Sequence, residues 1–167
     1  MLEGDARDSI FGSVAERFGI PLSSFDPYLL FKKGKSLWLM RRSDHLDSAF
    51  RLRVSMVGMR AFQVIGNFIK PSTRMIRFFG HGASRARIDL KREQLVALLE
   101  QGSLKADLGV EDGYVIMSFK GRILGVGLLL RGEIRSQLPQ REIPHVWNAT
   151  GGSGVSGNNS PLRQKRP

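Results

Sequence analysis

The sequence contains no cysteine, so it can form no disulfide bond and offers no thiolate to a metal or a substrate. Long apolar segments are also missing. The best apolar run, residues 123–130, holds eight residues, against the roughly 20 that a membrane-spanning helix needs. The N-terminal residues MLEGDARD are acidic and polar, so we expect no secretory signal. These absences favour a cytoplasmic protein that does not insert into a membrane.

Catalytic motifs are missing as well. His45, His81 and His145 lie far apart in the chain and form no HxxxH or HExxH spacing, so we predict no metal site. There is no GxSxG nucleophile elbow and no GxxxxGK[ST] phosphate loop, and the glycines at 125 and 127 lack the third glycine of a dinucleotide-binding turn. We therefore predict a protein that is not an enzyme and holds no cofactor. The alternative, a small enzyme, requires a pocket that gathers His81 or His145 with a carboxylate.

Positive charge, by contrast, is abundant. The chain has 26 Lys and Arg against 15 Asp and Glu, a formal net charge of +11. Such a balance favours nucleic acid or an anionic membrane as partner. Without the tail, residues 151–167, the formal net charge is still +8, so the positive charge belongs mainly to the part of the chain expected to fold. The densest stretch is residues 70–92, with seven basic residues and one acidic residue: Lys70, Arg74, Arg77, Arg85, Arg87, Lys91 and Arg92 against Asp89.

Aromatic side chains interrupt this basic stretch at Phe78, Phe79 and His81. Cations for phosphates and flat rings for unstacked bases together favour single-stranded or irregular RNA. Glycines at 80 and 82 would let a phosphate approach the backbone closely. Since Phe78 and Phe79 are adjacent, we expect at least one of them to face the core. A second basic cluster, residues 32–35, is predicted to be a solvated hairpin tip.

Apolar periodicity predicts an α+β protein whose first half combines a helix with an antiparallel sheet. Asp8 or Ser9 is the expected N-cap of the helix and Gly19 its C-cap. Trp38 is expected to anchor the local core. Residues 69–71 read as a hinge into a second half. The expected elements are a helix over 8–18, strands over 28–31 and 37–40, a half-buried strand over 50–57 and its antiparallel return over 60–65 or 60–68.

The second half centres on a three-stranded meander over residues 113–139. Its first two strands are apolar on both faces, which favours a small closed or strongly coiled barrel over an open sheet. Gly125 and Gly127 fit a tight bend or the close approach of another backbone. The predicted order is a helix from Ser72 or Thr73 to 79, a strand over 86–90, a helix over 91–101 ending at Gly102, a polar connection over 103–112, and strands over 114–119, 123–130 and 133–138 joined by turns at 120–121 and 131–132.

One family resemblance agrees with this order. The stretch RARIDLKREQLVALLEQGSLKADLGVEDGYVIMSFKGRILGVG, residues 85–127, is similar to a PUA domain: strand, helix closing on glycine, connection, then a strand pair ending in G-x-G. The continuation LLRGEIRSQLP resembles the C-terminal RNA-binding module of RNA cytosine-5 methyltransferases. It also resembles small archaeal ribosome-biogenesis proteins, as do the upstream ERFGIP and NFIKPSTRMIRFFG. The resemblance implies an N-terminal helix-plus-antiparallel-sheet domain (1–70) packed on a PUA-like β-barrel (71–147), followed by a flexible basic tail (148–167).

The resemblance also implies where RNA lies, namely against the helix after the first strand, the preceding loop and the late strand. Carried onto this chain it implies Arg85, Arg87, Lys91, Arg92, Gly102, Gly113, Tyr114, Arg131 and Arg135. The basic stretch, independently of the resemblance, adds four residues to the predicted RNA-binding set: Lys70, Arg74, Arg77 and His81.

We therefore expect a non-catalytic RNA-binding protein that positions structured rRNA or tRNA during RNA maturation or ribosome biogenesis. Its expected protein partner is an RNA methyltransferase or a ribosome-assembly factor. The chain cannot itself be a cytosine-5 methyltransferase, because that chemistry needs a cysteine nucleophile. The alternative is a protein-interaction adaptor for an RNA-modifying enzyme. Such an adaptor would use apolar patches such as residues 50–65 and would bind RNA only incidentally.

Overall fold

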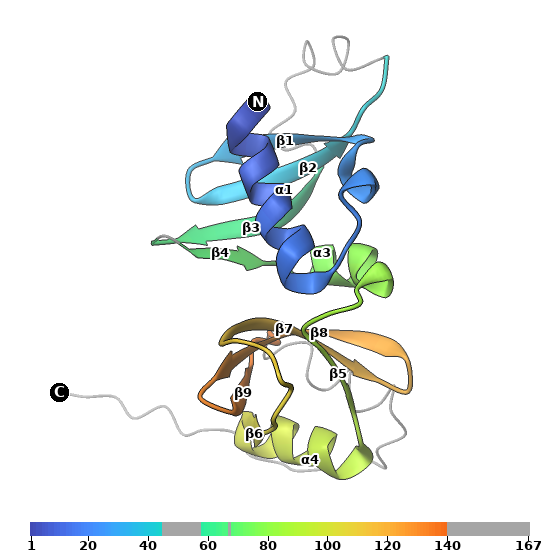
Figure 1. Ribbon diagram of the computed structural model, residues 1–167, viewed down its shortest axis with the longest axis vertical. Helices are drawn as coiled ribbons and strands as arrows, with labels where there is room; N and C mark the ends of the chain where they lie inside the picture. The colour runs from blue at the N-terminus through green and yellow to red at the C-terminus, as the bar shows by residue number, and fades with distance from the viewer. Residues whose placement is uncertain (45–57, 67, 140–167) are drawn as a thin grey trace, which may run out of the picture.

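Two β-sheets and three α-helices make up the part of the chain that the computed structural model describes, residues 1–44, 58–66 and 68–139 (Figure 1). The architecture is mixed α+β, which confirms the predicted class. The strand expected over residues 50–57 and the tail over 148–167 lie outside the described residues. The three helices are α1 (Gly4–Phe18), α3 (Thr73–Phe79) and α4 (Arg92–Gln101).

The first sheet is antiparallel throughout, and α1 covers one of its faces (Figure 1). Phe11, Val14 and Phe18 form the buried stripe of α1, as their helical spacing predicts. In the order β1-β2-β3-β4 the strands are β1 (Tyr28–Lys33), β2 (Ser36–Arg41), β3 (Met59–Ile65) and β4 (Phe68–Pro71).

The start of α1 differs from the prediction, whereas its end agrees. Glu3 is the N-cap, without a side-chain hydrogen bond, so the expected caps Asp8 and Ser9 lie inside the helix. The first turns of α1 are polar and largely exposed, so they carry no hydrophobic periodicity from which to predict them. Gly19 ends the helix in the left-handed region with φ 64°, where glycine is favoured.

The residues expected to form a hinge, 69–71, belong to β4. This strand pairs only with β3 among the described strands, so it is an edge strand, and Pro71 ends it. An edge strand tolerates proline because a backbone N–H is not required on its outer side. Ser72 then caps α3 as predicted, its Oγ accepting a hydrogen bond from the Met75 N–H at 3.1 Å.

The second sheet curls into a half-barrel, and α4 packs against its last two strands (Figure 1). The first pair, β5 and β7, is parallel and the others are antiparallel. Its strand order is β5 (Arg87–Leu90), β7 (Gly113–Phe119), β8 (Arg122–Leu130), β9 (Glu133–Ser136) and β6 (Ser103–Lys105). The sequence placed β6 in a polar connection. It is a strand because β9 offers it a free edge, a non-local partner that local periodicity does not reveal.

Both turns of the predicted meander are confirmed. Lys120 and Gly121 have φ values of 49° and 74°, and Arg131 and Gly132 have 51° and 75°. Two consecutive residues of positive φ make a type I′ turn, whose twist suits a two-residue hairpin.

Strand β8 is buried along consecutive residues, from Ile123 to Gly127, as expected for a strand covered on both faces. Helix α3 packs against β8, and this helix also contacts β3, so it joins the two sheets. One continuous hydrophobic cluster contains buried residues of both sheets, among them Phe62 on β3, Phe79 on α3 and Ile116 on β7.

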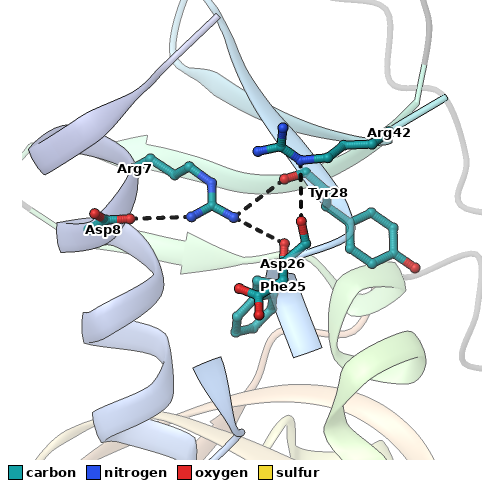
Figure 2. A network of polar contacts seen from close by, with 6 residues as sticks. All are labelled: Arg7, Asp8, Phe25, Asp26, Tyr28 and Arg42. Carbon is teal, nitrogen blue, oxygen red and sulfur yellow. Dashed lines mark hydrogen bonds and ion pairs between the residues drawn. The ribbon is translucent and has the colours of Figure 1, made fainter. Parts of the chain in front are cut away.

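A polar network around Arg7 fixes α1 to the segment that enters the first sheet (Figure 2). The Arg7 guanidinium donates to the carbonyls of Phe25 and Tyr28 at 3.1 and 3.5 Å and pairs with the Asp8 carboxylate at 3.2 Å. From β2's end, the Arg42 Nε donates to the Asp26 carbonyl at 3.3 Å. Both cations therefore satisfy backbone carbonyls, and we assign them a structural role.

Candidate nucleic-acid interface

A cleft of about 600 Å³ lies where the two sheets meet. Strands β2, β3 and β4 line one side, the first residues of α3 line the next, and β8 with the residues after β9 complete it. The two halves of the chain thus build this site jointly. Lys70 and Arg74 are the two members of the predicted RNA-binding set that line it.

Among the described residues, three charged side chains line the cleft, and each is positive: Arg60, Lys70 and Arg74. Lys70 donates from Nζ to the Gln137 Oε1 at 2.6 Å. The exposed side chains of Arg60 and Arg74 form no hydrogen bond or ion pair with another described residue. Since no carboxylate lines the cleft among residues 1–44, 58–66 and 68–139, the local field favours an anion.

Trp38 lines the same cleft and stands directly opposite Arg60 in the register of β2 and β3. Residues opposite one another in an antiparallel pair point to the same face. Trp38 is half-buried rather than a core anchor, and its indole N–H is shielded from solvent without an acceptor among the described residues. The sequence analysis missed Trp38 and Arg60 as site residues, because the pairing that brings them together spans a non-local contact.

A second group of predicted residues meets around Arg17 of α1. The Arg17 Nε and Nη1 donate to the carbonyls of Tyr114 and Glu111, each at 2.8 Å, and the guanidinium lies against Gly113. Burial lowers the pKa of Arg17 and is the largest effect on it. The nearby Arg85 lowers this pKa further, and the Glu111 carboxylate partly offsets the decrease. Burial also raises the pKa of the Tyr114 phenol. Arg85, Gly113 and Tyr114 are therefore brought together, with Arg17 as a residue that the prediction missed.

Arg87, Lys91 and Arg92 follow along β5 and into α4. The Nε of half-buried Arg87 donates to the Ser118 hydroxyl at 3.5 Å, whereas Lys91 and Arg92 are exposed. Leu90 pairs with Phe119, so the start of α4 lies beside the β7–β8 turn. That turn adds two exposed cations that the prediction did not include, Lys120 and Arg122.

The remaining predicted residues lie elsewhere or are already engaged. Gly102 and Arg135 belong to the β6–β9 edge, opposite to β5 in the sheet, where the Gly102 carbonyl accepts from the Ser136 N–H at 2.8 Å. Arg135 pairs with the Glu133 carboxylate at 3.3 Å. Arg131 lies in the β8–β9 turn, and its backbone N–H donates to Asp112 at 2.9 Å.

On α3, Arg77 donates twice to the Leu124 carbonyl, at 3.0 and 2.7 Å, and so holds the helix to β8. His81 is exposed in the short 3₁₀ turn Gly80–Gly82 that follows. Phe79 is buried while Phe78 is 61% exposed, which confirms that one of the two faces the core. Phe78 lies four residues after Arg74 and therefore on the same side of the helix, where a ring and a cation are displayed together.

No protein-family model matches this chain, and no curated protein matches it. Within residues 1–44, 58–66 and 68–139, every helix is too short or too polar to cross a membrane. In the same described ranges, no three or more His, Asp or Glu side chains gather closely enough to hold a metal ion.

Proposed function

We propose that this protein is a non-catalytic, PUA-like RNA-binding protein that positions structured rRNA or tRNA during RNA maturation or ribosome biogenesis. In this proposal a separate RNA-modifying enzyme or assembly factor supplies the chemistry. The phosphate-binding surface in this proposal follows the chain through β5 to the start of α4 and adds the cations at the β7–β8 turn: Arg85, Arg87, Lys91, Arg92, Lys120 and Arg122.

One observation carries the proposal. Arg85, Lys91 and Arg92 are exposed and make no ion pair with a described residue, although the chain has carboxylates to offer. Exposed cations without carboxylate partners are free to replace the counterions of a phosphate backbone, which is the main source of affinity for nucleic acid. Arg85 precedes β5, and Lys91 and Arg92 begin α4 at its other end, so the three cations follow one another along an extended path that suits an anionic chain.

The test is binding to a tRNA transcript as a function of salt. A triple variant, Arg85→Glu, Arg87→Glu and Lys91→Glu, is compared with Lys32→Glu, Lys33→Glu and Lys35→Glu, which changes the net charge equally at the β1–β2 turn. We expect the first variant to lose at least tenfold in affinity and to reduce the slope of log K against log salt by about 2, at roughly 0.7 per phosphate contact. Equal losses in both variants, or none in either, would refute the site.

A second candidate, a protein-interaction adaptor, is favoured by apolar side chains at the β3–β4 end. Ile65 and Phe68 pair there and are 44% and 72% exposed. An exposed apolar pair is typical of a protein contact. A partner that stays bound through nuclease treatment and high salt, but is lost on Phe68→Ser, would support this function over RNA binding.

A further inference from the structure

The cleft between the sheets is built from other elements than the β5–α4 surface, and the RNA-binding proposal leaves its most distinctive residues without a role. Trp38 comes from β2 and Arg60 from β3, whereas Lys70 and Arg74 flank the junction of β4 and α3. Four elements thus direct an indole and three cations to one space. Such convergence of a few polar groups in a concave site is typical of a binding site for a discrete ligand.

The charges define the sign of that ligand. Arg60 and Arg74 have no partner among the described residues, and Lys70 uses one of its three N–H donors on Gln137. The remaining guanidinium and ammonium donors line the same cleft, and none of the described residues that line it carries a carboxylate to compete with an oxyanion. A phosphate satisfies such donors through charge-assisted hydrogen bonds.

The size and walls of the cleft argue for more than a phosphate. Its volume of about 600 Å³ lies within the range of roughly 300–1,000 Å³ that small-molecule sites occupy. Phe62 and Val126 contribute buried apolar wall. Trp38 adds an aromatic side chain on which a base can stack, and an indole N–H that still lacks an acceptor among the described residues.

We propose that this cleft binds one nucleoside monophosphate unit, with its phosphate on Arg60, Lys70 and Arg74 and its base against Trp38. The unit is either a free nucleotide or a single unstacked nucleotide of a bound RNA. A nucleotide of a bound RNA rests on the proposed RNA-binding function, whereas a free nucleotide does not.

The test uses fluorescence of the full chain carrying Trp147→Phe, which leaves Trp38 as the sole tryptophan. AMP and UMP are titrated beside adenosine and inorganic phosphate, and isothermal calorimetry repeats the titrations without a tryptophan signal. We expect saturable binding of the monophosphates, at least tenfold tighter than of adenosine or phosphate. Arg60→Gln and Arg74→Gln should each weaken it at least fivefold. Arg41→Gln, the matched control at an exposed arginine of β2 that does not line the cleft, should leave it unchanged.

Three results would overturn the proposal: no saturable binding of any monophosphate, binding unaltered in both Arg60→Gln and Arg74→Gln, or inorganic phosphate bound as tightly as AMP. The exposed side chains of Arg60 and Arg74 make no hydrogen bond or ion pair with a described residue, so their variants should unfold at the wild-type temperature, which a thermal scan verifies.

Competition then distinguishes the sources. Displacement of AMP by a single-stranded oligonucleotide identifies the unit as part of RNA, and simultaneous binding identifies a free nucleotide. If the chain binds AMP but no RNA, the proposed function fails and the cleft assignment stands. If it binds RNA through Arg85 and Lys91 but no monophosphate, only the cleft assignment fails.

Discussion

Replacing Gly127 with alanine tests how tightly the half-barrel is packed. The new Cβ would lie 2.7 Å from the Ile134 Cγ2 and 3.0 Å from the Met117 Sδ, against an ordinary carbon contact of about 3.5–4.0 Å. Both neighbours are fully buried, at 0% exposure, and have little room to move. Overpacking of a buried site costs about 1–3 kcal/mol, so the free energy of unfolding should fall by that amount.

The measurement is urea unfolding followed by circular dichroism, with a thermal scan in which the midpoint should fall by about 3–10 °C. The matched control is Gly12→Ala in the interior of α1, where a Cβ would meet nothing within 4 Å. There the better helix propensity of alanine should stabilise the protein by up to about 1 kcal/mol. Opposite signs for the same chemical change would confirm the packing argument. A Gly127→Ala protein as stable as the wild type would refute it.

Three further predictions concern the contacts that join the elements. Arg17→Lys should lower the free energy of unfolding by about 1–3 kcal/mol, because an ammonium cannot reach both the Tyr114 and Glu111 carbonyls. Arg17→Met, which keeps the apolar stem of the side chain, should lower it by a similar amount in a urea titration. An unfolding midpoint equal to that of the wild type in both variants would count against the contact. Ser72→Ala should lower the free energy of unfolding by about 1–2 kcal/mol, because it removes the N-cap of α3, and Ser72→Thr should retain most of that free energy. Equal unfolding midpoints for the two variants would show that the cap does not stabilise the protein. Burial should raise the pKa of the Tyr114 phenol above its ordinary value of 10.0, so its contribution to stability is complete below pH 10 and is lost as the pH rises through the raised pKa. Absorbance at 295 nm, with Tyr114→Phe as control, measures the titration. A Tyr114 pKa that is not raised would contradict the burial of the phenol.

The meander was predictable because its information is local. Glycines at 121 and 132 mark two-residue turns, and the apolar residues between them identify the strands. The roles of the glycines at 125 and 127 were not predictable. Side chains fill the space beside them, Leu138 and Thr73 at the first and Ile134 and Met117 at the second, where the sequence had led us to expect a bend or another backbone. Which side chains arrive beside a glycine depends on the pairing of β7, β8 and β9, and a single strand does not encode it.

The candidate site was likewise predictable only in part. The sequence alone determined the net positive charge of the chain and the stretch that carries most of it, since the cations of residues 70–92 are visible without coordinates. The folded chain decided which cations are available: Arg77 is committed to the Leu124 carbonyl, while Arg74, one turn earlier, is free to face the cleft. It also brought Trp38 beside Arg60, because cross-strand register places side by side residues that are far apart in the sequence. Charge is a property of composition, whereas a site is a property of contacts between distant segments, and only folding makes those contacts.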